Sequence, residues 1–270
     1  GLAAPFASGG LGFDFRMAMG IADHWIKWLK EKSDEQWSMG EIWWELTNKR
    51  ADEKTISYAE CHDQALVGDK TLIFRMMDKE MYTAMNVESR NLVVDRGIAL
   101  HKLIRLVTLA TAGDGYLTFM GNEFGHPEWI DFPRAGNGWS YKYARRQWSL
   151  CKPDYLRYKY LMNFDEDMVH LFRDSGILAF RPELIRADED KKVLVFRRGS
   201  YIFAFDFNPS GSFSDYGFEA PQGDWKLVLD SDEKCYDGFA RLTTGELHHA
   251  DTALSVYLPS RCALVLVKIK

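Results

Sequence analysis

The order of apolar and polar residues over the first 175 positions predicts strands and helices in turn. Short β-prone runs stand at residues 13–16, 55–58 and 116–120. Stretches with helical periodicity follow at 17 to about 32, 70–77, 94–112 and 154–171, and a further helix carries Trp37, Trp43 and Trp44. Strands that alternate with helices form parallel sheets with right-handed connections, so an α/β fold is predicted here.

From about residue 177 the pattern changes to short runs of alternating apolar and polar residues. These runs lie at 192–197, 201–207, 225–229, 255–258 and 262–269, with Pro, Gly, Asn and Ser between them. Short strands separated by turn residues are typical of an antiparallel sandwich. The sequence therefore predicts two domains, one at residues 1–175 and an all-β sandwich at 176–270.

Composition and charge narrow the class of protein. The 270 residues are 46% hydrophobic and 27% charged, as in globular proteins. A net charge of -5 provides no excess of positive charge for binding nucleic acid or an anionic membrane. No apolar run approaches the ~20 residues of a membrane span. The four cysteines are widely spaced and lack a metal-ligand pattern, so we expect free thiols and a cytoplasmic protein.

Two polar segments directly follow predicted strands. The run at 55–58 leads into Tyr58-Ala59-Glu60-Cys61-His62-Asp63-Gln64-Ala65, and the run at 116–120 leads into Gly121-Asn122-Glu123-Phe124-Gly125-His126-Pro127-Glu128-Trp129. An imidazole beside a carboxylate at a strand end suits the recognition of polyols and the stabilisation of charge.

Together the two segments resemble the glycogen and starch branching enzymes of the α-amylase superfamily. In that family the first segment closes the seventh strand of a (β/α)8 barrel and the second follows the eighth, and Cys61 stands where the pattern usually has Ser. The resemblance extends to residues 9–16 and 130–148. It implies that residues 1–175 are about three βα units of a TIM barrel and that the all-β domain follows it.

The resemblance also implies roles for six residues. Asp63 would stabilise an oxocarbenium-like transition state by accepting hydrogen bonds from sugar hydroxyls, with His62 donating to a neighbouring hydroxyl. Two interpretations stay open for Gln64, Asn122 and Glu123, which either contact the glucan or fix their loops. Trp129 is a candidate for stacking on a sugar ring. No metal and no organic cofactor is implied.

Two further carboxylates of the family reaction are expected outside this sequence. Retaining glycosidases and transglycosidases need a nucleophile and an acid/base about 5–5.5 Å apart, and in the family these come from the fourth and fifth strands. Residues 1–5 resemble the segment just after the fifth strand, so we expect both groups upstream of Gly1 and an inactive isolated chain. Three βα units leave sheet edges unpaired, so an N-terminal part of the same polypeptide is the expected partner.

The implied function is that of a 1,4-alpha-glucan branching enzyme in glycogen or starch biosynthesis. Such a retaining glycosyltransferase cleaves an α-1,4 glucan, for example glycogen, amylose or amylopectin, and transfers the segment to a 6-hydroxyl to form an α-1,6 branch. Two alternatives stay open: another amylase-type α-glucan hydrolase, and a non-catalytic glucan-binding fragment.

Overall fold

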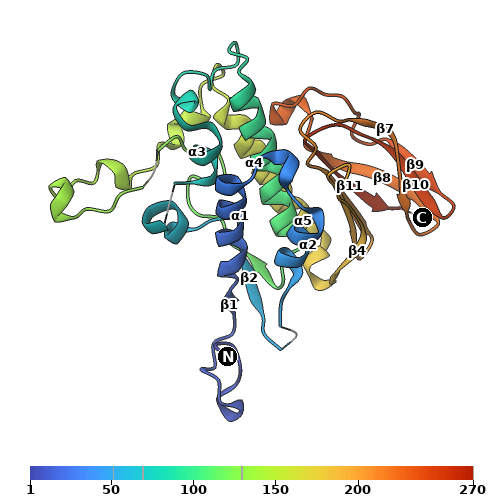
Figure 1. The fold of residues 1–270 in the computed structure, drawn as a ribbon, viewed down its shortest axis with the longest axis horizontal. Coiled ribbons are helices and arrows are strands. Elements are labelled where there is room, and N and C mark those ends of the chain that lie inside the picture. Colours follow the sequence, from blue (N-terminus) through green and yellow to red (C-terminus); the bar gives the residue numbers. More distant parts are fainter. Residues whose placement is uncertain (51, 69, 129, 270) are drawn as a thin grey trace.

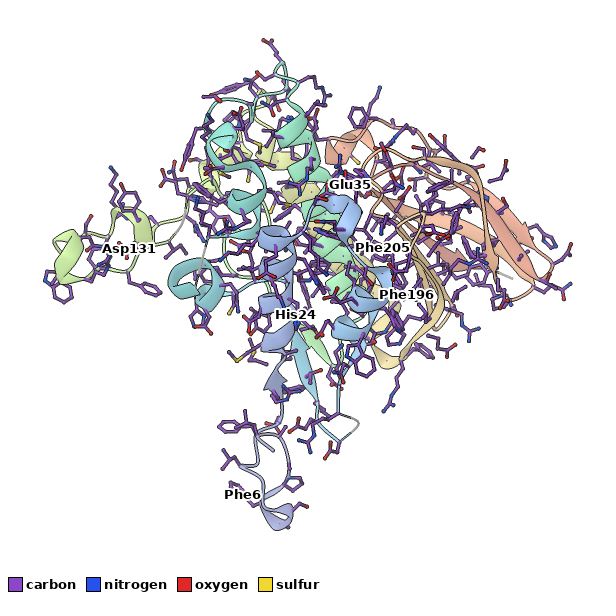
Figure 2. All side chains as sticks on the ribbon, in the orientation of Figure 1. Phe6, His24, Glu35, Asp131, Phe196 and Phe205 are labelled. Atoms are coloured by element: carbon purple, nitrogen blue, oxygen red, sulfur yellow. The ribbon has the colours of Figure 1, made fainter. Side chains whose placement is uncertain are left out.

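The chain folds into a helical part built around a small parallel sheet and a β-rich part beside it (Figure 1). The computed structural model describes residues 1–50, 52–68, 70–128 and 130–269, apart from the side chains of 66–68. Two segments project from the helical part, one at the N-terminus around Phe6 and one around Asp131 (Figure 2). No helix in the described ranges combines the length and the apolar character needed to cross a membrane.

Three short parallel strands lie at the centre of the helical part. They are β1 (Arg16–Met17), β2 (Thr55–Ser57) and β3 (Gly115–Tyr116), paired in the order β1-β2-β3. The strand expected at 13–16 is wrong in its bounds, because pairing with β2 begins only at Arg16. The strand expected at 116–120 begins at Gly115 and ends at Tyr116, so the rest of that apolar run is loop.

Within the described ranges, five α-helices accompany this sheet. Their bounds are α1 (Met19–Glu31), α2 (Met39–Thr47), α3 (Leu72–Met77), α4 (Leu92–Ala110) and α5 (Tyr158–Ser175). The apolar stripe of α1 is buried as its periodicity predicts, and its Trp25 indole N–H donates to the Thr108 hydroxyl of α4 at 3.0 Å. The Asn91 side chain caps α4 by accepting the N–H groups of Val93 and Val94, which fixes the start of the helix.

The β-rich part contains two antiparallel sheets, as the alternating runs predict. One sheet has the strand order β4-β5-β6-β11-β8-β9 and the other pairs β10 with β7. The bounds are β4 (Pro182–Asp188), β5 (Val193–Arg198), β6 (Tyr201–Asp206), β7 (Phe213–Glu219), β8 (Gly223–Asp230), β9 (Leu247–Ala250), β10 (Ala253–Leu258) and β11 (Cys262–Lys268). The sequence did not predict β4, β7 or β9.

Both faces of the larger sheet are buried, and this joins the two parts. Successive residues of a strand point to opposite faces. Ile202 and Ala204 of β6 pack in a core shared with β7 and β10, whereas Phe203 and Phe205 pack in a core shared with the helices. Phe205 and Phe196 accordingly lie between the sheet and the helices (Figure 2).

Candidate functional site

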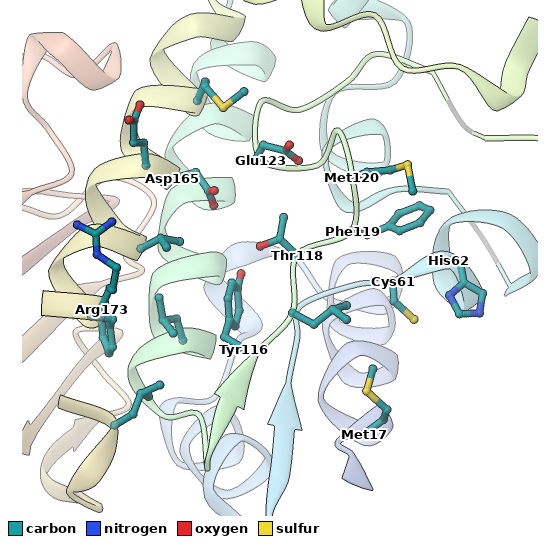
Figure 3. A pocket seen from close by; sticks show the side chains of 17 residues that line it. Met17, Cys61, His62, Tyr116, Thr118, Phe119, Met120, Glu123, Asp165 and Arg173 are labelled. Carbon is teal, nitrogen blue, oxygen red and sulfur yellow. The ribbon is translucent and has the colours of Figure 1, made fainter. Parts of the chain in front are cut away.

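The two polar segments meet at one edge of the parallel sheet. The carboxyl ends of parallel strands lie on the same side, and ligands of α/β sheets bind outside these ends. The segment after β2 and the segment after β3 both border a cleft of about 940 Å³ (Figure 3). Its lining includes His62, Phe119, Met120 and Glu123.

His62 and Asp63 form an exposed pair at this edge. The His62 Nε2 atom lies 3.2 Å from Asp63 Oδ1, and the two side chains are 58% and 47% exposed. Asp63 begins a π-type helical turn, η3 (Asp63–Gly68), which carries the chain away from β2. The His62 ring also lies 6.4 Å from the ring of Phe119. Both polar groups are therefore accessible to a ligand, but only His62 lines the cleft, whereas Asp63 lies outside its lining.

Gln64 lies inward and fixes the turn. It is 5% exposed, and its side-chain oxygen accepts the Cys61 backbone N–H at 3.1 Å. Its amide nitrogen donates to Asp23 Oδ1 on α1 at 2.8 Å. Of the two interpretations open for Gln64, this geometry favours the one in which it fixes its loop.

Asn122 and Glu123 are neighbours in the sequence, but only Glu123 lines the cleft. Asn122 is 2% exposed, so its side chain is buried. Glu123 lines the cleft, and burial raises the pKa of its carboxyl group. No hydrogen-bond partner for its Oε2 atom occurs among the described residues. Of the pair, Glu123 is placed to meet a ligand, and the predicted stacking residue Trp129 lies outside the described residues.

A buried ion pair supports the cleft from the helices behind it. Arg105 of α4 donates to Asp165 of α5 and lies 3.2 Å from the Thr118 hydroxyl. Thr118 and Asp165 also line the cleft. Because Arg105 is almost fully buried, loss of Asp165 would leave an uncompensated charge in the interior.

Sequence reasoning missed the apolar wall of the cleft. Phe119 and Met120 were assigned to a strand, but β3 ends at Tyr116 and both residues belong to the loop that follows. Met120 is exposed, and Phe119 stands beside His62. The sequence signal that could have placed them in the loop is the glycine that follows them. Gly121 has a positive φ, and the chain turns there.

Glu60 shows how the segment after β2 is tied to the next helix. Its carboxylate accepts the Leu72 N–H at the start of α3 at 2.7 Å. Burial raises its pKa to about 7.

Among the described residues no group of three His, Cys, Asp or Glu side chains is arranged to hold a metal ion.

Comparisons with known proteins agree with the resemblance. Residues 184–268 match the family model described as Alpha amylase, C-terminal all-beta domain. The chain is 49% identical to a 1,4-alpha-glucan-branching enzyme of Rhizophagus irregularis, covering 98% of this chain and 41% of the relative. The branching enzyme of Equus caballus is 51% identical, with 99% and 40% covered. The chain thus spans about two fifths of the length of these curated relatives.

Solved structures show the same fold at low identity. An alpha-amylase from H. orenii superposes with a TM-score of 0.55 at 15% identity, covering 98% of this chain and 51% of that one. A debranching enzyme from Nostoc punctiforme gives 0.57 at 16% identity, with 95% and 48% covered. At these identities the likeness concerns the fold alone.

Proposed function

We propose that this chain, which is homologous over nearly its whole length to the 1,4-alpha-glucan-branching enzymes, forms part of an enzyme that builds α-1,6 branches into an α-glucan. The observation that carries the proposal is the identity of about half of the residues to enzymes of that name. The expected substrates are α-1,4 glucans such as glycogen, amylose and amylopectin.

Residues 1–175 supply part of a (β/α)8 barrel in this proposal, and residues 176–270 form its all-β domain. The three parallel strands support it, because β1 and β3 each have a single hydrogen-bonded neighbour among the described strands. Unpaired strand edges invite further strands. A complete barrel needs eight strands, so further polypeptide, expected from the N-terminal part of the same protein, would pair with these edges.

The proposed chemistry is a double displacement at the anomeric carbon of the donor glucan. A carboxylate attacks that carbon while an acid protonates the departing glycosidic oxygen, and positive charge builds on the ring. The covalent glucan then passes to a 6-hydroxyl of a second chain. We assign the nucleophile and the acid/base to the polypeptide that completes the barrel.

Asp63 and His62 stabilise the charged ring in this scheme. The Asp63 carboxylate accepts hydrogen bonds from sugar hydroxyls, and such charge-assisted bonds are roughly twice as strong as neutral ones. His62 donates to an adjacent hydroxyl. The supporting observation is that both side chains are accessible at the carboxyl end of β2, where ligands of such sheets bind.

We place the protein in a reducing compartment, the cytoplasm, because its cysteines form no disulfide bond among the described residues. Cys61, Cys151, Cys235 and Cys262 are all free thiols. No metal or organic cofactor enters the proposed reaction.

The test is replacement of Asp63 by asparagine in the full-length protein. We expect branching to fall by at least about 10²-fold, the scale for removing one group that stabilises transition-state charge. Asp154→Asn is the matched control, since that carboxylate is 98% exposed and pairs only with Lys159 among the described residues. Unchanged activity of Asp63→Asn would remove Asp63 from the mechanism.

The same assay separates the alternatives. Branching lowers the iodine colour of amylose without releasing reducing ends, because each bond that is broken is replaced by one that forms. A hydrolase would release reducing ends, and a non-catalytic glucan-binding protein would change neither signal.

A further inference from the structure

Arg146 closes the loop that follows β3. Its Nε donates to the Met120 carbonyl oxygen at 2.8 Å, and its Nη1 donates to the Glu128 carbonyl oxygen at 3.1 Å. These two carbonyls mark the ends of the turn at residues 120–128, called the 120–128 turn below. A planar guanidinium presents several donors in a fixed fork, so one side chain can hold both ends of the turn at once.

Gly121 leaves the space that Arg146 occupies. A Cβ atom at position 121 would lie 2.7 Å from Arg146 Nε and 2.8 Å from its Cδ, which is too close for either atom. The backbone at Gly121 also has a φ of +87°, in the region that favours glycine. Gly121 and Arg146 are therefore a matched pair, and the turn depends on both.

The guanidinium also reaches the wall of the cleft. Its Cζ atom lies 5.5 Å from the centre of the Phe119 ring, within the range of a cation–π contact. Phe119 lines the cleft beside His62, and Glu123 enters the cleft from the 120–128 turn. Arg146 thus contacts the backbone that carries Glu123 and the ring that neighbours His62.

We propose that Arg146 is a positioning residue that holds the 120–128 turn and the Phe119 ring where they face a bound α-glucan. This inference rests on the proposed function, because it assigns the cleft to a glucan. Arg146 acts through Phe119 and Glu123 and does not itself contact the substrate.

The polar surroundings of Arg146 agree with a fixed and charged guanidinium. Burial lowers its pKa to about 10, opposed by the charges of Glu60 and Glu123, so it stays protonated at neutral pH. Its Nη1 lies 3.1 Å from His126 Nδ1. Burial and this neighbouring cation lower the pKa of His126 to about 4, which keeps the imidazole neutral. A neutral ring accepts a hydrogen bond from Arg146, whereas a protonated ring would repel it.

The experiment compares Arg146→Ala and Arg146→Lys with Arg145→Ala in the full-length enzyme. Arg145 is the exposed neighbour of Arg146 and serves as the matched control. Branching is measured against amylose concentration between about pH 5 and pH 8, the range in which an unperturbed histidine titrates. Thermal unfolding of each variant is recorded in parallel.

We expect Arg146→Ala to raise KM by about tenfold, the factor that corresponds to 1.4 kcal/mol of lost binding free energy. Arg146→Lys should give a smaller rise, because it keeps a cation but loses the fork, and Arg145→Ala should leave KM unchanged. In Arg146→Ala the pKa of His126 moves up towards its ordinary range. A proton on His126 Nδ1 would stop that atom from accepting the Glu128 N–H, which it does at 3.3 Å within the 120–128 turn. KM of that variant should therefore rise further as the pH falls, while KM of the wild type does not.

A purely structural role of Arg146 would change a different set of measurements. It would lower the melting temperature and the amount of active enzyme, hence kcat, and leave KM and its pH dependence as in the wild type. That outcome overturns the proposal. If Arg146→Ala does not fold, the KM of Arg146→Lys decides in the same way. An inactive wild-type enzyme would instead refute the proposed function.

Discussion

Replacement of Asp206 by asparagine should remove a pH dependence from the stability of the β-rich part. Asp206 ends β6, is fully buried and accepts the Asn208 N–H through Oδ1 at 2.8 Å. Its Oδ2 has no hydrogen-bond partner among the described residues. Burial raises its pKa from 3.8 to about 8, against the opposing effects of the Asn208 N–H and of Arg241. The folded protein therefore holds a proton on Asp206 at neutral pH.

The sign and size of the effect follow from linkage. The unfolded chain releases the Asp206 proton near pH 3.8, whereas the folded chain keeps it up to about pH 8. The stability that this group contributes is fully present below pH 3.8 and is lost as the pH rises to about 8. The loss is about 1.4 kcal/mol for each pH unit and about 4 kcal/mol by pH 7.

Asparagine keeps the Oδ1 acceptor but cannot ionise. Its amide group has two N–H donors where the protonated carboxyl of the wild type has one O–H, and the additional buried donor left unpaired costs about 1–3 kcal/mol at every pH. Asp206→Asn should accordingly be no more stable than the wild type near pH 4. Relative to the wild type it should then gain about 1.4 kcal/mol for each pH unit up to about pH 8.

Urea unfolding at half-unit intervals from pH 4 to pH 8 measures this difference. Asp230→Asn is the matched control: Asp230 ends the nearby strand β8, is also fully buried, and accepts the Asp232 N–H through Oδ1 at 2.8 Å. Burial raises the pKa of Asp230 only to about 6. The stability of Asp230→Asn relative to the wild type should stop rising near pH 6, whereas that of Asp206→Asn should rise up to about pH 8. A constant difference between Asp206→Asn and the wild type across this range would refute the reasoning.

Two buried cations that join the helical and β-rich parts give further predictions. Arg198 of β5 donates through Nη1 to the carbonyls of Ala110 and Ala112 at the end of α4, at 2.9 and 2.7 Å. Arg198→Met should lower the free energy of unfolding by several kcal/mol, at about 1–3 kcal/mol for each unpaired group, and Arg198→Lys by less, as measured by urea unfolding. Lys102 of α4 donates to the Ser231 carbonyl, and burial lowers its pKa to about 8. The folded protein therefore releases the Lys102 proton at lower pH than the unfolded chain does. The free energy of unfolding of the wild type should rise between about pH 8 and 10.5, and urea unfolding of Lys102→Met should show no such rise.

The sequence predicted those elements whose residues carry their own signal. The stripe of α1 and the apolar runs of β5, β6 and β11 are local patterns, and each element lies close to its predicted position. The missed strands β4 and β9 are the two edges of the larger sheet. Edge strands have one neighbour and many exposed residues, so their apolar pattern is weak and their pairing depends on residues far along the chain.

The candidate site was predictable as a location but not in its detail. The segments after β2 and β3 stand out by composition, and the topology brings them to one cleft. Whether a residue there faces the cleft depends on distant partners: Gln64 points inward because Asp23, 41 positions earlier, accepts its amide. Arg146 gave no local signal either, since its acceptors lie 18 and 26 positions before it.

Helix α4 shows most clearly where pattern reasoning stops. Periodicity predicts that charged residues of a helix face solvent, yet Lys102 and Arg105 are both buried. Their positions become favourable only because α5 and the β-rich part supply acceptors, as Asp165 does for Arg105 and the Ser231 carbonyl does for Lys102. Buried charges need such partners. The charge of Lys102 is therefore explained by the packing of α4 against the β-rich part, and that of Arg105 by its packing against α5, which no single segment of the sequence encodes.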